Sequence, residues 1–123
     1  MTVDDEPGFI RLLKFSLERT GNYIVREEND ATKALEVAEQ FKPDLILLDL
    51  IMPKMDGNDV AAQLRSNPVT HETPVVFLTA TALSDEFSDP AQIDACTVLA
   101  KPVSLSRLIR AIEENVGVLA VAD

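Results

Sequence analysis

The sequence predicts an α/β fold in which helices cover both faces of a parallel sheet. Short apolar runs, such as residues 45–48 and 75–78, alternate along the chain with segments of helical periodicity. Runs of this length without polar alternation are typical of strands that are buried on both faces. The chain has 123 residues, which is the size of one domain with a single layered core.

The first half of the chain contains three predicted strands and two predicted helices. Residues 1–3 form a short apolar first strand, and Pro7 suits the first turn of the helix that follows. We expect residues 23–26 to form the second strand. Asp30 is a suitable cap for the second helix, which ends before Pro43 and leads into the third strand.

The second half continues the alternation of strands and helices. The third strand ends in Asp49, and the next helix starts after Gly57, where Asp56 and Gly57 are expected to shape the loop. Residues 75–79 form the fourth strand. Ser104 is expected to cap a final amphipathic helix.

The region between Thr79 and Lys101 is the least regular part of the sequence. A fifth strand is expected at residues 98–100, and a crossover helix must precede it. Pro90 and several nearby serine and aspartate residues weaken that helix. We therefore expect it to be short, distorted or mobile.

Composition argues against several classes of function. The chain has 21 acidic and 11 basic residues and a net charge of −10, and the basic residues are scattered, so we expect no direct nucleic-acid binding. No apolar stretch reaches the roughly 20 residues that span a bilayer. The N-terminus is acidic where a signal peptide would be basic, so we expect a cytoplasmic protein with no membrane segment.

Polar side chains follow four of the predicted strands at the point where each strand ends. Asp4 and Asp5 follow the first strand, Asp49 and Thr79 end the third and fourth, and Lys101 follows the fifth. Ligands bind beyond the carboxyl ends of the strands in an open α/β sheet, so we expect these side chains to lie together. Three carboxylates, a hydroxyl and an ammonium suit a divalent cation and a phosphoryl group.

These residues and their neighbours resemble the receiver domain of two-component response regulators, the fold of the chemotaxis response regulator. The separations from Asp5 to Asp49, from Asp49 to Thr79 and from Thr79 to Lys101 are 44, 30 and 22 residues, as in that family. The resemblance implies a doubly wound, flavodoxin-like three-layer sandwich with five parallel strands in the order 2-1-3-4-5. The matching motifs are Asp4-Asp5, Asp49 with Met52-Pro53, Asp56-Gly57, Thr79-Ala80 and Lys101-Pro102.

The resemblance also implies a phosphoryl acceptor of a phosphorelay rather than an enzyme with turnover. Asp49 would take a phosphoryl group from a histidine of a sensor kinase or a histidine phosphotransfer protein, and Thr79 and Lys101 would bind the phosphoryl oxygens. The modified domain would then bind a downstream protein differently. We expect a monomer or a weak dimer.

A magnesium ion is the cofactor that the resemblance implies. Asp5, Asp49 and the backbone carbonyl of Ile51 would be direct ligands, and Asp4 would act mainly through water. The first strand is short because residues 1–3 alone precede Asp4. We expect this to lower both stability and metal affinity.

Two residues near the site differ from those usual in the family. Val98 stands where many members carry an aromatic side chain that turns inward, so we expect residues 83–93 to carry the conformational response. Ile51 lies two residues beyond Asp49, and its apolar side chain cannot orient a hydrolytic water by hydrogen bonding. The sequence therefore predicts slow self-dephosphorylation.

Two other functions fit parts of the same pattern. A phosphatase with an aspartyl-phosphate intermediate typically has a second aspartate two residues after the nucleophile, and this chain has Ile51 there. A receiver-like interaction module that works without phosphorylation would be expected to lack the acceptor or the lysine. Asp49 and Lys101 are both present, and the interaction module ranks second because of the short first strand.

The domain is expected to span residues 1–117, and residues 118–123 form an apolar C-terminal tail. We expect this tail to be disordered or to add a helical turn. The other interpretation is a short strand at residues 118–121 that pairs with an exposed sheet edge.

Overall fold

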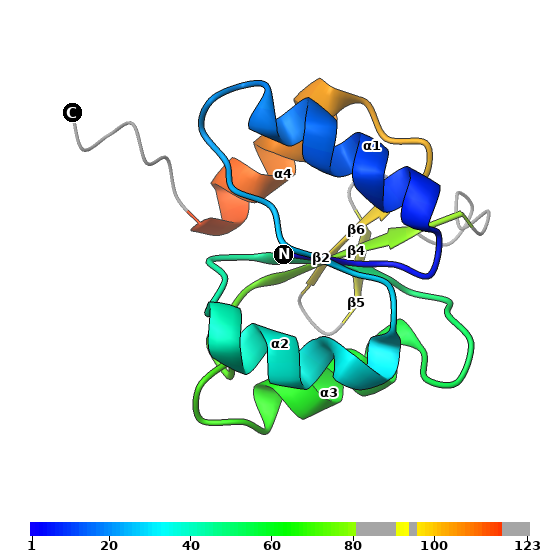
Figure 1. The fold of residues 1–123 in the computed structure, drawn as a ribbon, viewed down its shortest axis with the longest axis vertical. Coiled ribbons are helices and arrows are strands. Elements are labelled where there is room, and N and C mark those ends of the chain that lie inside the picture. The colour runs from blue at the N-terminus through cyan, green and yellow to red at the C-terminus, as the bar shows by residue number, and fades with distance from the viewer. Residues whose placement is uncertain (81–90, 94–95, 117–123) are drawn as a thin grey trace.

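The computed structural model describes residues 1–80, 91–93 and 96–116, and it has three layers with a central sheet (Figure 1). None of the described helices has the length and hydropathy needed to cross a bilayer. The helices cover the sheet in pairs, one pair on each face. These pairs are Pro7–Glu18 (α1) with Leu105–Val116 (α4), and Ala34–Phe41 (α2) with Gly57–Arg65 (α3).

The described strands form one sheet, in which five strands are parallel and one edge strand is antiparallel. In spatial order the strands are Glu27–Glu28 (β2), Thr2–Val3 (β1), Ile46–Asp49 (β3), Val75–Thr79 (β4), Cys96–Ala100 (β6) and Ala91–Ile93 (β5). The fifth parallel strand along the chain is labelled β6, because the antiparallel strand β5 precedes it. Counted without β5, the parallel strands have the predicted order 2-1-3-4-5, and the first strand is short, so the predicted fold class is confirmed. The antiparallel edge strand was not predicted.

Residues 23–26 do not form the second strand predicted for them. The strand β2 starts at Glu27, which pairs with Thr2 in the parallel ladder. The backbone N–H of Val25 donates instead to the carboxylate of Glu18, 2.9 Å away. Val25 is therefore bonded to α1, whereas the carbonyl of Arg26, the next residue, accepts the N–H of Thr2 in β1 at 2.9 Å.

The crossover helix expected before the fifth strand falls mainly on residues 81–90, which lie outside the described residues. Residues 91–93 of the same region form the edge strand β5, so the helix does not extend into them. The conformational response expected at residues 83–93 stays a prediction. The expectations for the tail, residues 118–123, also lie outside the described part of the chain.

Side-chain caps start several of the described helical segments. Ser104 accepts a backbone N–H from the first turn of α4 at 3.2 Å, as predicted. Asp56 and Asp59 form a capping box at the start of α3. Asp30 caps the short 3-10 segment Ala31–Lys33 (η1), which leads directly into α2, so its capping role is confirmed one segment earlier than expected.

The strand β3 lies between two apolar cores, and all its residues are buried. Successive side chains of a strand point to opposite faces of the sheet. Ile46 and Leu48 pack in the core that includes side chains of α2 and α3, whereas Leu47 packs with side chains of α1 and α4. Burial on both faces explains why this strand is apolar without alternation.

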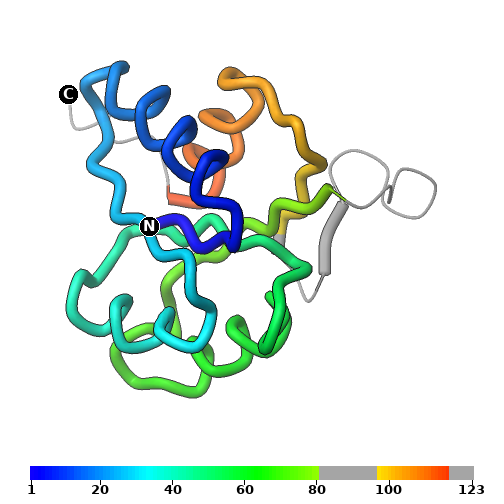
Figure 2. Tube along the Cα trace, turned by 45° about the vertical axis from the view of Figure 1, so that its right-hand side comes forward, coloured from blue at the N-terminus to red at the C-terminus, as the bar shows by residue number. Residues whose placement is uncertain are grey.

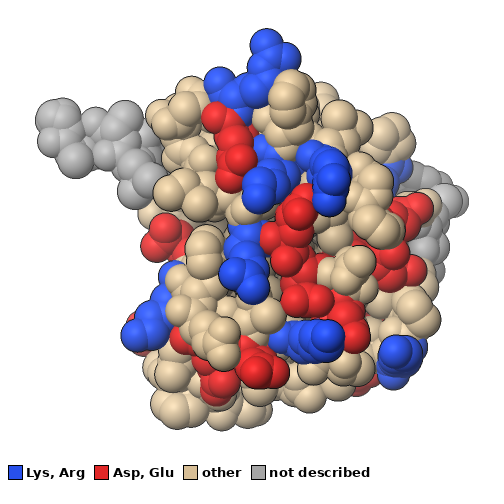
Figure 3. Space-filling view, viewed as in Figure 1, with Lys and Arg blue, Asp and Glu red and all other residues tan. Residues whose placement is uncertain are grey.

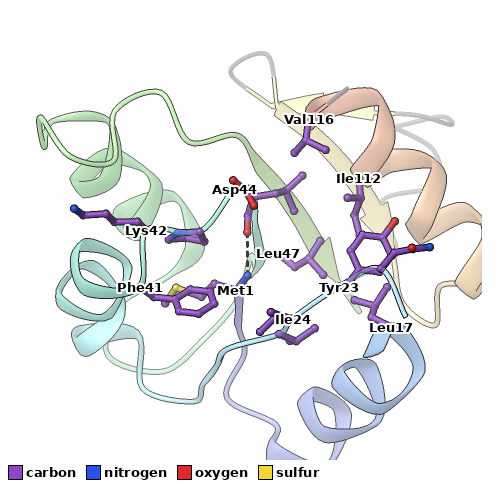
Figure 4. A pocket seen from close by; sticks show the side chains of 14 residues that line it. Met1, Leu17, Tyr23, Ile24, Phe41, Lys42, Asp44, Leu47, Ile112 and Val116 are labelled. Atoms are coloured by element: carbon purple, nitrogen blue, oxygen red, sulfur yellow. Dashed lines mark hydrogen bonds between the residues drawn. The ribbon is translucent and has the colours of Figure 1, made fainter. Parts of the chain in front are cut away.

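An apolar pocket of about 390 Å³ lies at the end of the sheet where the central strand β3 begins (Figure 4). Its lining includes Leu17 of α1, Phe41 of α2 and Ile112 of α4, together with the ring of Tyr23. Asp49 stands at the other end of β3. The pocket is therefore separate from the polar side chains at the carboxyl ends of the strands.

Candidate functional site

The carboxyl ends of four strands bring the predicted polar residues to one edge of the sheet. Asp4 follows β1, Asp49 and Thr79 are the last residues of β3 and β4, and Lys101 follows β6. The N–H of Lys101 donates to the carbonyl of Thr79 at 2.8 Å, which continues the ladder to the site. Figure 2 shows the chain leaving the sheet on the same side of the molecule after β1, β3 and β6.

The ammonium of Lys101 lies among three carboxylates. Its Nζ is 2.6 Å from Oδ2 of Asp4, 3.1 Å from Oε1 of Glu6 and 3.7 Å from Oδ2 of Asp49. It also lies 4.3 Å from the centroid of the Phe9 ring, a distance at which the face of the ring attracts a cation. The side chain of Lys101 is 8% exposed, so these contacts replace most of its water.

Burial and neighbouring charges shift the pKa of two groups at the site. Desolvation, followed by the nearby Asp4 carboxylate, raises the pKa of Asp49 to about 6, although Lys101 acts in the opposite direction. Burial alone would lower the pKa of Lys101. Hydrogen bonds to Asp4 and Glu6 outweigh this and raise the pKa of Lys101 above its ordinary value, so the group stays cationic.

Asp4, Asp5 and Asp49 form one acidic cluster. One oxygen from each carboxylate lies within 4.8 Å of the other two. Asp4 and Asp49 are buried and Asp5 is exposed, so the cluster has one side open to water. Hard oxygen donors with access for water fit Mg²⁺, which keeps several waters and takes one or two carboxylates directly.

Thr79 lies beside Asp49 on the neighbouring strand, and Ile51 follows Asp49 two residues later in the sequence. The register of β3 and β4 pairs Asp49 with Leu78, so Thr79 lies one residue beyond Asp49 on the neighbouring strand. The residue Thr79 is 1% exposed and Ile51 is 58% exposed. The N–H of Ile51 lies 3.4 Å from Oδ1 of Asp49, which is a long hydrogen bond.

Gly57 allows the loop after β3 to pack against the backbone of Asp49. A Cβ atom at Gly57 would lie 2.5 Å from the carbonyl oxygen of Asp49 and 2.8 Å from Cα of Leu50. The N–H of Gly57 donates to the carbonyl of Leu50 at 2.8 Å. Asp56 caps α3 at the same point, and both residues therefore shape the loop that follows the candidate acceptor.

Two contacts of Lys101 were not predicted from the sequence. Glu6 follows the aspartate pair and occupies the N-cap position of α1, yet it makes no side-chain cap. Glutamate is not among the preferred capping residues, and this mismatch is the signal that could have drawn attention to it. Phe9 resembles any other apolar residue of an amphipathic helix, and no local signal distinguishes it.

Comparison with known protein families supports the interpretation of this geometry. The family model for the response regulator receiver domain matches residues 1–113. This chain belongs to the response regulator receiver domain family. The matched range includes all the polar residues of the candidate site in this receiver domain, namely the acidic cluster, Thr79 and Lys101.

Relatives of this receiver domain include regulators of different lengths. The alkaline phosphatase synthesis transcriptional regulatory protein PhoP of Bacillus subtilis is 40% identical over 107 residues, which are 85% of this chain and 42% of that protein. The receiver domain thus spans about half the length of PhoP and of other transcriptional regulators that it matches. The polar-differentiation response regulator DivK of Brucella anthropi is 29% identical over 117 residues, which are 95% of this chain and 94% of that protein.

A solved structure with a bound metal ion has the same fold. It is the receiver domain of a sensor histidine kinase from Pseudomonas aeruginosa PAO1, with a magnesium ion coordinated in its active site cleft. The two proteins are 28% identical with a TM-score of 0.78, and the match covers 95% of each chain. Receiver domains bind Mg²⁺ at the active site, and the acidic cluster of this chain provides carboxylates of the required kind.

Replacing Gly57 with alanine is expected to destabilise the receiver domain by about 1–3 kcal/mol, because the new methyl group overlaps the backbone of Asp49. Gly8→Ala is the matched control, since nothing lies within 4 Å of a Cβ atom there. Gly8 lies in α1, where alanine is favoured over glycine by about 0.5–1 kcal/mol. Urea unfolding followed by circular dichroism measures both variants. Equal stability of Gly57→Ala and the parent would contradict the close approach.

In protein stripped of divalent cations, Asp49 is expected to make stability depend on pH. Its pKa in the folded state is about 6, above the ordinary value of 3.8, so the folded state favours the protonated carboxyl. The stabilisation is present below about pH 4 and is lost as the pH rises through about 6. Asp49→Asn stays neutral, so its stability relative to the parent should increase across this interval. Urea unfolding at a series of pH values measures this difference, and a difference independent of pH would contradict the raised pKa.

Proposed function

We propose that this receiver domain accepts a phosphoryl group on Asp49 from a phosphohistidine of a partner protein, in a Mg²⁺-dependent reaction. The observation that carries the proposal is the position of the Lys101 ammonium beside two buried carboxylates, those of Asp4 and Asp49. Asp5 completes the acidic cluster on the side that is open to solvent. An aspartate on a rigid strand, with cationic charge beside it, is suited to attack phosphorus.

The proposed reaction transfers one phosphoryl group between two side chains. A carboxylate oxygen of Asp49 forms a bond to phosphorus as the bond from phosphorus to the histidine nitrogen breaks, and the imidazole leaves and takes up a proton from solvent. Lys101 and the hydroxyl of Thr79 bind phosphoryl oxygens, which stabilises the charge of the transferred group. The aspartyl phosphate then favours one arrangement of the neighbouring loops.

The bound magnesium ion would supply positive charge between the acceptor and the phosphoryl oxygens. We propose Asp5, Asp49 and the backbone carbonyl of Ile51 as direct ligands. Asp4 is 1% exposed and its carboxylate already bonds Lys101 and the N–H of Glu6. These bonds favour a role for Asp4 through water rather than as a direct ligand.

The proposed partners are a sensor histidine kinase or histidine phosphotransfer protein as donor and a downstream protein as target. We propose that residues 1–117 act as a single-domain response regulator, in the cytoplasm and as a monomer or weak dimer. On the face drawn in Figure 3, basic and acidic side chains are interspersed, which does not favour nucleic acid as a partner.

An apolar groove beside the site supports docking of a partner protein. It lies between α1 and the start of α4 and is lined by Phe9, whose ring also contacts Lys101. Leu12 of α1 and Leu105 of α4 line the same groove and are exposed. Exposed apolar side chains next to a reactive group are typical of a protein interaction surface.

The alternative function, an interaction module that works without phosphorylation, is not favoured, because the acceptor Asp49 and Lys101 are both in position.

Incubation with acetyl phosphate and Mg²⁺, followed by intact mass measurement, tests the proposal directly. The parent is expected to gain one phosphoryl group, and Asp49→Asn is expected to gain none because it lacks the acceptor carboxylate. Glu36→Gln removes a negative charge from an exposed position in α2 and should be modified like the parent. An adduct on Asp49→Asn, or no adduct on the parent, would contradict the proposal.

Slow self-dephosphorylation is expected because the exposed side chain of Ile51 cannot orient a water by hydrogen bonding. Ile51→Asn supplies an amide at this position and is expected to shorten the lifetime of the aspartyl phosphate by about tenfold, the scale of one good hydrogen bond. Decay of the phosphorylated mass after removal of the donor measures the lifetime. Ile51→Val is the matched control, and equal lifetimes of Ile51→Asn and the parent would count against the role of this residue.

A further inference from the structure

We propose that Glu6 and the ring of Phe9 form an outer holding site for the ammonium of Lys101, and that this site limits how readily Lys101 reaches the phosphoryl group. The proposal rests on the proposed phosphoacceptor function. It makes Glu6 a positioning residue, because Glu6 acts through Lys101 and does not touch the reacting atoms.

The partners of Lys101 fall into two sets that differ in burial. The inner set is Asp4, at 2.6 Å from Nζ, and Asp49, at 3.7 Å, and both carboxylates are buried. The outer set is Glu6, at 3.1 Å, and the Phe9 ring, at 4.3 Å from its centroid. The Glu6 side chain is 63% exposed, so the outer set faces solvent on one side. The ammonium therefore lies between a buried and an exposed group of partners.

The local structure of Glu6 supports a role other than starting the helix. It occupies the N-cap position of α1 with an extended backbone, but its side chain makes no capping bond. Its N–H donates to Oδ1 of Asp4 at 3.0 Å, which fixes its backbone beside the inner set. A shorter Ser, Thr, Asp or Asn would cap this helix better. Glutamate instead has the length to reach Lys101.

The inner carboxylates cannot hold a divalent cation and an ammonium equally well. Asp4 and Asp49 belong to the acidic cluster that fits Mg²⁺, and two cations that share the same oxygens repel each other. When Mg²⁺ occupies the cluster and binds Asp49, the inner set attracts Lys101 less strongly, so Glu6 and Phe9 contribute a larger share of the contacts that hold Lys101 beside Asp4. Lys101 must then leave Glu6 to bind a phosphoryl oxygen, so Glu6 competes with the phosphoryl group for the same ammonium.

Two substitutions of Glu6 test this competition at saturating Mg²⁺. Glu6→Gln removes the charge, and Glu6→Asp keeps the charge but shortens the side chain and gives α1 a capping residue. Both are expected to raise the rate of phosphorylation by acetyl phosphate about two- to fivefold, the range of an exposed ion pair. Glu36→Gln, in the first turn of α2, makes the same charge change in another helix and should leave the rate unchanged.

Nitrogen-15 NMR of the lysine ammonium groups tests the holding site without phosphorylation. In the Mg²⁺-loaded parent, the Lys101 ammonium is expected to give a hydrogen-bonded, slowly exchanging signal, which Lys101→Arg identifies by its loss. This signal should shift or broaden in Glu6→Gln and in Glu6→Asp, and it should be unchanged in Glu36→Gln. An unchanged Lys101 signal in both Glu6 variants would overturn the proposal.

The rate measurements contain two further results that would overturn it. If Glu6→Asp is phosphorylated at the same rate as the parent while Glu6→Gln is phosphorylated faster, then the charge of residue 6 affects the rate and its contact with Lys101 does not. If Glu6→Gln still accelerates phosphorylation in a Lys101→Ala background, the effect does not pass through Lys101. Failure of the parent to accept a phosphoryl group would refute the proposed function, and the NMR measurement would still decide the holding site.

Discussion

The polar edge of this receiver domain depends on the ion pairs between Lys101 and the carboxylates buried at the ends of β1 and β3. Asp4 and Asp49 are almost fully removed from water, and a buried carboxylate without a cationic or hydrogen-bonding partner is strongly destabilising. Lys101 contacts both. Burial and the Asp4 carboxylate raise the pKa of Asp49 in spite of Lys101, and three carboxylates around one ammonium leave an acidic cluster whose oxygens suit a further cation.

The rest of the fold holds these groups in register. Ile46, Leu47 and Leu48 of β3 pack into the two cores, which fixes the backbone that carries Asp49. Gly57 lets the loop after β3 pack against the carbonyl of Asp49. The N–H of Lys101 donates to the carbonyl of Thr79 at the end of β4. Pairing of β1 with β2 and β3 positions Asp4 in spite of the shortness of that strand. Rigid strands carry the carboxylates, and a longer, flexible side chain carries the ammonium.

The parts that the sequence predicted well are those that depend on local patterns. The uninterrupted apolar strands, the caps at Asp30 and Ser104, and the polar residues that follow four of the strands come from rules of burial, helix capping and parallel pairing. The second strand was misplaced because Glu27 and Glu28 lack a strand-like composition, and pairing with β1 rather than propensity forms β2. The antiparallel β5 pairs with β6, the next strand along the chain, and was missed because a crossover helix was expected in this region. The contacts of Lys101 with Glu6 and Phe9 are long-range, and no local pattern specifies them.

A crystal structure of this receiver domain with Mg²⁺ and beryllium fluoride, a mimic of the phosphoryl group, tests the account most directly. We expect beryllium bonded to a carboxylate oxygen of Asp49, a magnesium ion bound by Asp5, Asp49 and the carbonyl of Ile51, and the ammonium of Lys101 in contact with a fluorine atom. Lys101 still bonded to Asp4 and Glu6, with beryllium fluoride absent from Asp49 or bound elsewhere, would contradict it.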